Sequence, residues 1–185
     1  MITIRKYEER DAENVKFACL NAEGYNSITD EATIMLVLHT FCEYYIEREP
    51  ENCFVVDADG KAVGFIISAE SFEPYKKALH EEYCEKVKPF GEQRYEWSKA
   101  STEIHEKFRD EYPAHFHINI LPEYQRVGAG GKLLDTLFEH YRNKGVKGIM
   151  LCCSAANEVG LNFYKKYGFT VLDETKDDVA FGMKL

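Results

Sequence analysis

Apolar and polar residues alternate, or apolar residues form short runs, in several separate segments of the chain. Each of these segments predicts a β-strand. The segments are residues 1–7, 52–57, 62–69, 114–121, 148–153, 169–172 and 179–185. An Asp59-Gly60 pair separates the second segment from the third, and such a pair favours a tight hairpin because both residues tolerate positive φ. The second and third strands are therefore expected to be antiparallel neighbours.

Apolar residues three and four positions apart predict helices between these strands. The expected helices are residues 11–22, about 29–48, a segment that runs from a glycine-rich stretch to Lys144, and 155–167. Thr29 or Asp30 can cap the second helix, and Gly145 and Gly168 can end the last two. The sheet is therefore expected to have helices on its faces.

Residues 71–112 lie between the third and fourth predicted strands and are rich in aromatic and charged side chains. Apolar spacing predicts one helix around Tyr83 and a second from Trp97 to Phe108, with Pro89 between them. We interpret the stretch as a helical insertion in a single domain that spans residues 1–185. The fold class expected from this order is α/β, with a mixed sheet.

The composition is that of an ordinary globular protein, with 45% hydrophobic and 30% charged residues in a chain of 185. No apolar stretch approaches membrane-spanning length, and the first residues do not form a secretion signal. We therefore expect a cytoplasmic protein that does not bind a membrane. The six cysteines include no Cys-x-x-Cys pair, and we expect free, mostly buried thiols rather than disulfides or metal ligands.

The net charge of −9 is unevenly distributed along the chain. Residues 1–112 hold 24 acidic and 14 basic residues, whereas residues 113–185 hold 8 acidic and 9 basic residues. The acidic first part favours a cationic partner and repels nucleic acid, and the second part is less repulsive to a polyanion. An ordinary solvated surface explains the same bias. A homodimer is left open.

A glycine-rich stretch follows the strand expected at 114–121 and opens the helix that ends at Lys144. It reads Tyr124-Gln125-Arg126-Val127-Gly128-Ala129-Gly130-Gly131-Lys132. Glycines allow the backbone to approach a ligand closely, and the first turn of a helix has unpaired N–H groups at the positive end of its dipole. Such a turn can bind phosphate or pyrophosphate, with Arg126 and Lys132 adding positive charge.

Two well-known phosphate-binding motifs do not fit this stretch. A P-loop requires a glycine where Arg126 stands and a hydroxyl residue where Leu133 stands. The dinucleotide-binding motif also requires a glycine at Leu133. The pattern that fits is Gln/Arg-x-x-Gly-x-Gly/Ala, met by Gln125, Gly128 and Gly130. It resembles the coenzyme A pyrophosphate loop of the GNAT acyltransferase superfamily.

A second signature strengthens this resemblance. Residues 157–169 read Asn-Glu-Val-Gly-Leu-Asn-Phe-Tyr-Lys-Lys-Tyr-Gly-Phe, similar to the superfamily pattern Asn-x-x-Ala-x-x-Phe-Tyr-x-x-x-Gly-Phe, with Gly160 in place of the usual alanine. The resemblance implies a mixed, mostly antiparallel sheet flanked by helices. Together with the insertion, residues 115–125 most resemble bacterial relatives of the acetyltransferase-like domain of O-GlcNAcases.

The resemblance also implies a set of site residues. In the superfamily the fourth and fifth strands splay apart, and the pantetheine arm of acetyl-CoA lies between them. The residues that match the cofactor-binding positions are Ile118, Asn119, Ile120, Gln125, Arg126, Val127, Gly128, Ala129, Gly130, Gly131, Lys132 and Asn157. Tyr164 matches the tyrosine that gives a proton to the departing thiolate. No metal is implied. Each position also has a structural interpretation, since Asn157 can be a helix cap and Tyr164 a core residue.

His115 and His117 are the candidates for the general base. They alternate along one predicted strand, so both point to the same face. Imidazole titrates near neutral pH, and paired histidines here resemble those of arylalkylamine acyltransferases. Hydrogen-bonded histidines of a sheet are an equally weighted alternative, and Glu70 and Glu123 are lesser candidates.

Three functions follow from these observations. The first is an acetyl-CoA-dependent N-acetyltransferase that acts on a primary amine of a small molecule or peptide. The second is a non-catalytic acyl-CoA-binding module, against which Tyr164 argues. The third is a protein-interaction module, against which the intact loop around Gly128 and Gly130 argues. No motif specifies the acceptor.

Overall fold

One sheet of seven strands, in the order β1-β2-β3-β4-β5-β7-β6, organises the part of the chain that the computed structural model describes, residues 2–21 and 30–185. The strands are β1 (Ile2–Lys6), β2 (Phe54–Ala58), β3 (Lys61–Ala69), β4 (Ala114–Ile120), β5 (Gly148–Ser154), β6 (Thr170–Glu174) and β7 (Asp178–Lys184). Only β4 and β5 pair in parallel among these strands, and the other pairs are antiparallel. The predicted α/β fold with a mixed, mostly antiparallel sheet is therefore confirmed.

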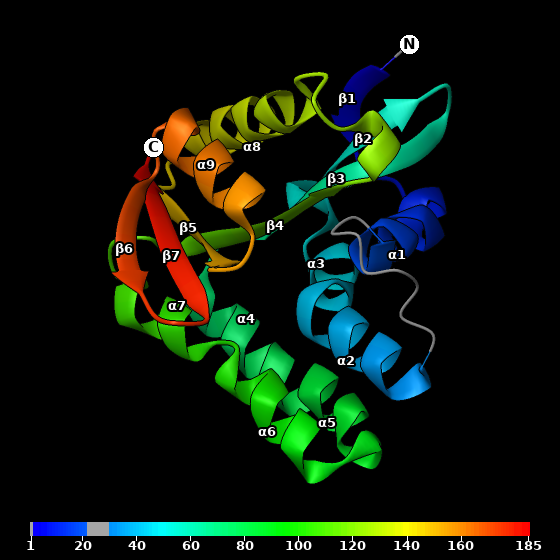
Figure 1. Cartoon of the computed structure of the whole chain (residues 1–185), viewed down its shortest axis with the longest axis vertical. Coiled ribbons are helices and arrows are strands. Elements are labelled where there is room, and N and C mark those ends of the chain that lie inside the picture. The colour runs from blue at the N-terminus through cyan, green and yellow to red at the C-terminus, as the bar shows by residue number, and fades with distance from the viewer. Residues whose placement is uncertain (1, 22–29) are drawn as a thin grey trace.

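Helices cover this sheet and fill the connection between β3 and β4. The helices before that connection are α1 (Ala12–Asn21), α2 (Glu31–Phe41) and α3 (Glu43–Arg48). Those within it are α4 (Phe72–Ala78), α5 (Cys84–Val87), α6 (Glu92–Ala100) and α7 (Glu103–Phe108), with a π-helical segment (Leu79–Tyr83) joining α4 to α5. The helices after it are α8 (Ala129–Lys144) and α9 (Glu158–Tyr167). Figure 1 shows α4 to α7 gathered at one end of the molecule, apart from α8.

Several local predictions are confirmed. Asp59 and Gly60 adopt positive φ in the β2–β3 turn. Asp30 caps α2 by accepting a hydrogen bond from the N–H of Thr33, whereas the alternative cap, Thr29, lies outside the described residues. Gly145 ends α8 in the left-handed conformation. These features depend on residues close in sequence, which explains why the pattern predicts them.

Other boundaries differ from the prediction. The helix expected at 29–48 is two helices, because the backbone breaks at Cys42. The helix expected from Trp97 to Phe108 is also two, α6 and α7, which are separated at Ser101 and Thr102. The helix expected from residue 155 begins three residues later as α9. Apolar spacing continues past Cys42 and past Ser101, so it does not mark where these helices are interrupted.

The two faces of the sheet have different surroundings near β4. Phe116 lies on one face, where its ring contacts those of Tyr164 from α9 and Phe169. His115 and His117 lie on the opposite face, where both contact the ring of Tyr45 from α3. All six cysteines lie in the described residues, and none of them forms a disulfide bond there. No helix in residues 2–21 and 30–185 is long and apolar enough to cross a bilayer.

Candidate functional site

The sheet opens between β4 and β5. These strands pair at Ala114 with Ile149 and at His115 with Met150, and the register ends there. By contrast, β3 pairs with β4 from Ala69–His115 to Gly64–Ile120 without a shift. The later part of β4 therefore has one edge bound to β3 and the other turned toward the opening. Ile118, Asn119 and Ile120 lie on this part and are half-buried.

The glycine-rich loop connects this part of β4 to the start of α8. Arg126 and Gly128 both have positive φ, 61° and 81°, and Gly128 is the N-cap of the helix that begins at Ala129. Glycine adopts this conformation without strain, whereas a left-handed arginine costs about 1 kcal/mol or more. Gln125 closes the turn by donating a hydrogen bond from Nε2 to the carbonyl oxygen of Ile120, at 2.7 Å.

Gly130 and Gly131 of the loop lie in different surroundings. A Cβ added to Gly130 would lie 3.2 Å from Cζ of Phe163, so this glycine allows α8 to pack closely against α9. A Cβ added to Gly131 would meet no other atom within 4 Å. Gly131 therefore borders open space at the first turn of α8, where backbone N–H groups are available for an anion.

Positive charge surrounds this helix start. The side chains of Arg126 and Lys132 are both exposed. Val127 between them in the sequence is also exposed, with 57% of its surface accessible. The first turn of α8 has no acidic residue. The positive side chains and the dipole of α8 therefore both attract an anion to this helix start. The residues present fit a pyrophosphate group.

Asn157 is the N-cap of α9, with Oδ1 accepting a hydrogen bond from the N–H of Gly160 at 2.8 Å. The structural interpretation of Asn157 is thus confirmed, and its side-chain amide N–H groups remain for a further role. The structure also explains why glycine, and not alanine, occupies position 160. A Cβ there would lie 2.9 Å from Nδ2 of Asn157 and 3.0 Å from Sγ of Cys153, so the usual alanine would displace the cap.

Tyr164 is buried on α9 among aromatic side chains. Its ring contacts those of Phe116, Phe169 and Phe181 at centroid distances of 6.5, 5.6 and 5.5 Å. Because Phe116 and His117 are consecutive residues of a strand, they point to opposite faces. Tyr164 and the histidines therefore flank β4 from its two sides.

The two histidines share one hydroxyl group. Oη of Tyr45 lies 3.0 Å from Nε2 of His115 and 3.1 Å from Nε2 of His117. The prediction that both rings point to one face is confirmed. The sequence pattern does not distinguish Tyr45, because it lies in a run of apolar and aromatic positions typical of a buried helix.

Burial changes the acid–base properties of these rings. It lowers the pKa of His117 to about 3 and that of His115 well below its usual range. Both rings are therefore neutral at pH 7. The reason for choosing histidine from the sequence, its titration near neutral pH, does not hold in this environment. A neutral ring still accepts a hydrogen bond and takes a proton from a group of low pKa.

The insertion packs directly on the histidines. The ring of Tyr75 from α4 lies 4.2 Å from that of His115, and the ring of His105 from α7 lies 4.8 Å from it. On the other side, Phe41 of α2 contacts both His117, at 5.4 Å, and the half-exposed Trp97 of α6, at 5.7 Å. Aromatic rings thus connect the surface of the insertion to His117.

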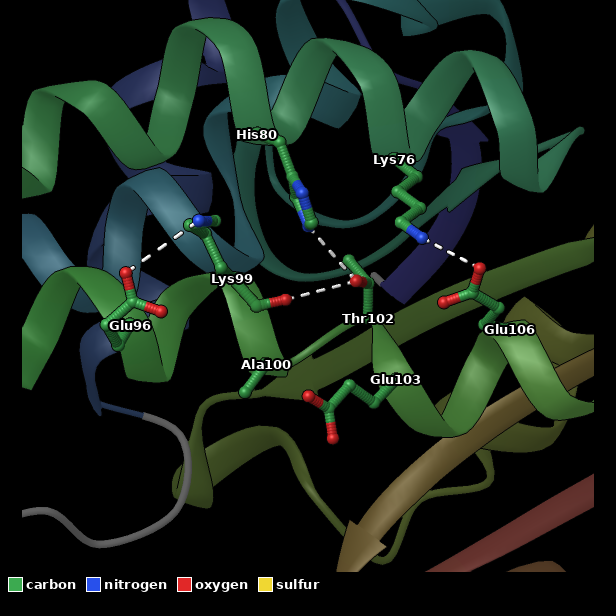
Figure 2. Close-up of a pocket in the computed structure, with 8 residues that line it drawn as sticks. All are labelled: Lys76, His80, Glu96, Lys99, Ala100, Thr102, Glu103 and Glu106. Atoms are coloured by element: carbon green, nitrogen blue, oxygen red, sulfur yellow. Dashed lines mark hydrogen bonds and ion pairs between the residues drawn. The ribbon is translucent and has the colours of Figure 1, made fainter.

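A separate cavity of about 300 Å³ lies within the insertion. Figure 2 shows it between the helical segment that carries Lys76 and His80 and the segment that carries Thr102, just before α7, and Glu106. Lys76 pairs with Glu106 at 2.8 Å in its lining, and His80 contacts the hydroxyl of Thr102 at 3.1 Å. We assign it no part in the site at β4, because its lining belongs entirely to the insertion.

Comparison with known proteins agrees with this geometry. The chain belongs to the acetyltransferase (GNAT) family, whose family model matches residues 21–169.

Solved structures share the fold over essentially the whole chain. SsHAT superposes with a TM-score of 0.87 at 22% identity, covering 99% of this chain and 98% of that one. The PaiA N-acetyltransferase of Thermoplasma acidophilum, solved in complex with coenzyme A, gives 0.63 at 20% identity, covering 100% and 99%. The Drosophila melanogaster polyamine N-acetyltransferase, described as forming N-acetylagmatine, gives 0.67 at 14% identity, covering 100% of both chains.

Proposed function

We propose that the protein is an acetyl-CoA-dependent N-acetyltransferase that transfers the acetyl group to a primary amine of a small molecule or peptide. The observation that carries the proposal is the opening of the sheet after the His115–Met150 pair. At this opening the end of β4 leads into the glycine-rich start of α8. His117 lies on one face of β4, and Tyr164 lies beyond the opposite face. Membership of the GNAT family supports the same reaction class.

In this proposal the later part of β4 and the loop hold acetyl-CoA. Backbone groups at Ile118, Asn119 and Ile120 would bond the pantetheine arm along the open edge. The N–H groups from Val127 to Gly131 would bind the pyrophosphate, with Arg126 and Lys132 adding charge. The amide of Asn157, whose Oδ1 is already used in capping α9, would donate to the pantetheine arm.

The neutral histidines restrict the acid–base chemistry. An alkylammonium has a pKa of about 10. The imidazole of His117, whose pKa is about 3, therefore cannot take a proton from an alkylammonium ion. The amine must lose that proton to water as it enters. After the nitrogen has bonded to the acyl carbon it becomes far more acidic, and Nδ1 of His117, whose Nε2 contacts the hydroxyl of Tyr45, can then accept one of its protons. Tyr164 would donate a proton to the departing thiolate from the opposite side.

The acceptor is proposed to be a cationic amine that enters beneath the insertion. Residues 1–112, which include α2, α3 and the insertion, contain 24 acidic and 14 basic residues. The rings of Trp97 and Phe41 lie between the surface and His117, and an aromatic face attracts a cation. Within residues 71–112 the balance is weaker, with 10 acidic and 8 basic residues, so the attraction depends on the wider surface. The closer resemblance to O-GlcNAcase-associated domains stays a proposal.

The test is a turnover screen with acetyl-CoA and four acceptor classes, namely polyamines, arylalkylamines, amino sugars and lysine peptides. We expect N-acetylation of a cationic amine, with kcat/KM falling as salt rises because charges about 10 Å apart are screened at 0.1 M. Coenzyme A binding by calorimetry without turnover of any acceptor would instead favour the non-catalytic acyl-CoA-binding module. Absence of coenzyme A binding would favour the protein-interaction module.

A further inference from the structure

Tyr45 holds a central position between the two candidate base residues. It comes from α3, its side chain has no accessible surface, and Oη contacts Nε2 of both His115 and His117. Its ring also meets both imidazole rings edge-on, at centroid distances of 5.7 and 5.3 Å. Neither histidine can turn without breaking its contact with this one phenol.

The number of protons restricts how these contacts are made. A phenol hydroxyl has one proton to donate, and a neutral imidazole has one N–H. If Tyr45 donates to one Nε2 atom, it must accept an N–H from the other, and the two rings then have opposite tautomers. If the hydroxyl accepts from both, its own proton must go elsewhere, and the hydroxyl of Tyr75 is the neighbouring group.

We propose that Tyr45 is a positioning residue that holds the two histidines in opposite tautomers. It donates to Nε2 of His115 and accepts the Nε2–H of His117, so that Nδ1 of His117 keeps its lone pair for the acceptor nitrogen. This inference rests on the proposed function. We assign the Nε2–H tautomer to His117 because this ring is half-buried and can meet the acceptor through Nδ1, whereas His115 is only 1% exposed.

The surroundings keep this arrangement neutral. The titratable groups that face the pair are Tyr75 from α4, His105 from α7 and Tyr45 itself from α3. Burial raises the pKa of Tyr45 well above its usual range and lowers the pKa of His105 to about 4. All of these groups are uncharged at neutral pH. The tautomers are therefore determined by hydrogen bonds, not by a neighbouring ion.

Nitrogen NMR of the histidine rings tests the proposal directly. Two-bond ¹H–¹⁵N spectra distinguish the Nε2–H tautomer from the Nδ1–H tautomer, and the variants His115→Gln and His117→Gln assign the signals. We expect Nε2–H for His117 and Nδ1–H for His115 at pH 7. The same tautomer for both rings, or the reverse assignment, would overturn the proposal. This measurement does not depend on any transferase activity.

The variant Tyr45→Phe tests the consequence. It removes the shared hydroxyl and keeps the ring contacts, so we expect the tautomer of His117 to become mixed and kcat to fall at least about 10-fold. The KM for acetyl-CoA should change by less than about 2-fold. Tyr44→Phe is the matched control, because Tyr44 is buried on the same helix and its hydroxyl donates to Glu49 at 2.7 Å.

The kinetic arm uses the acceptor found in the turnover screen. Wild-type tautomers or an unchanged kcat in Tyr45→Phe would overturn the proposed role of this residue. An equal loss of kcat in Tyr44→Phe would do the same, since it would indicate a general effect of deleting a buried hydroxyl. If no acceptor is turned over, the proposed function fails, and the NMR result still decides whether Tyr45 sets the tautomers.

Discussion

The imidazole rings of His105 and His115 lie 4.8 Å apart, one on α7 of the insertion and the other on β4 of the sheet. Burial lowers the pKa of His105 to about 4, and burial together with the charge of its histidine neighbours lowers the pKa of His115 well below its usual range. Two imidazolium ions at this distance in a buried site would repel each other strongly. The insertion is therefore joined to the sheet through a contact that requires neutral rings.

This contact predicts a loss of stability in acid. The folded pKa of His105 is lowered, so below about pH 6.5 the unfolded chain binds a proton that the folded chain does not, and stability falls as pH decreases toward 4. His105 alone should reduce the free energy of unfolding by about 2 kcal/mol between pH 7.5 and pH 5. Urea unfolding at both pH values measures this loss.

The control for the acid prediction is His105→Gln, which cannot titrate. In this variant the free energy of unfolding should fall by about 2 kcal/mol less between pH 7.5 and pH 5 than in the wild type. This holds even if the substitution lowers stability at pH 7.5. Glu43 does not interfere, because the hydrogen bond from His39 lowers its pKa to about 2 and its effect falls mainly below pH 4.5. The prediction would be contradicted if the free energy of unfolding changed with pH by the same amount in the wild type and in His105→Gln.

Gly131 offers a clean test of the pyrophosphate site. Gly131→Glu places a negative side chain in the open space at the first turn of α8. An acidic residue there favours the helix dipole, so stability should be unchanged or slightly higher, while coenzyme A affinity falls at least about 10-fold. Gly131→Ala is the neutral control and should bind nearly as well as wild type. Gly128 is less suitable, because its φ of 81° adds strain to any substitution. Equal affinities by calorimetry for the wild type and Gly131→Glu would exclude this site.

Asn157 has a cap role that can be separated from ligand binding. Serine caps a helix about as well as asparagine but has no amide N–H groups. We therefore expect Asn157→Ser to keep the thermal midpoint of unfolding and to weaken coenzyme A binding about 10-fold, for the loss of roughly one hydrogen bond. Unchanged binding would limit Asn157 to capping α9.

Tyr164→Phe tests the proton donor. The change removes one hydroxyl and leaves the contacts with Phe116 and Phe181 in place. We expect kcat to fall by about 100-fold or less, as for one acid–base group, with a near-normal KM for acetyl-CoA. The control is Tyr167→Phe on the same helix, whose hydroxyl bonds Asp135 at the surface. If both variants retain wild-type kcat, another group or water protonates the thiolate.

Features that depend on neighbouring residues follow from the amino-acid sequence. Alternation predicts the strands, Asp59-Gly60 predicts the hairpin, and the glycine-rich stretch predicts a helix start after a strand. Period-two geometry is also sufficient to place His115 and His117 on one face. Turn chemistry, capping and side-chain periodicity act over a few residues, so they are visible in one chain.

The surroundings of these residues depend on the tertiary fold. Tyr45 is 70 positions from His115 in sequence, and the insertion places Tyr75 and His105 against the same ring. The resulting burial changes the histidines from groups that titrate near neutral pH into neutral hydrogen-bonding groups. Packing between helices likewise explains why Gly130 makes room for Phe163 and Gly160 for the Asn157 cap. Desolvation and close packing arise from contacts between distant segments, and no local pattern of residue types encodes them.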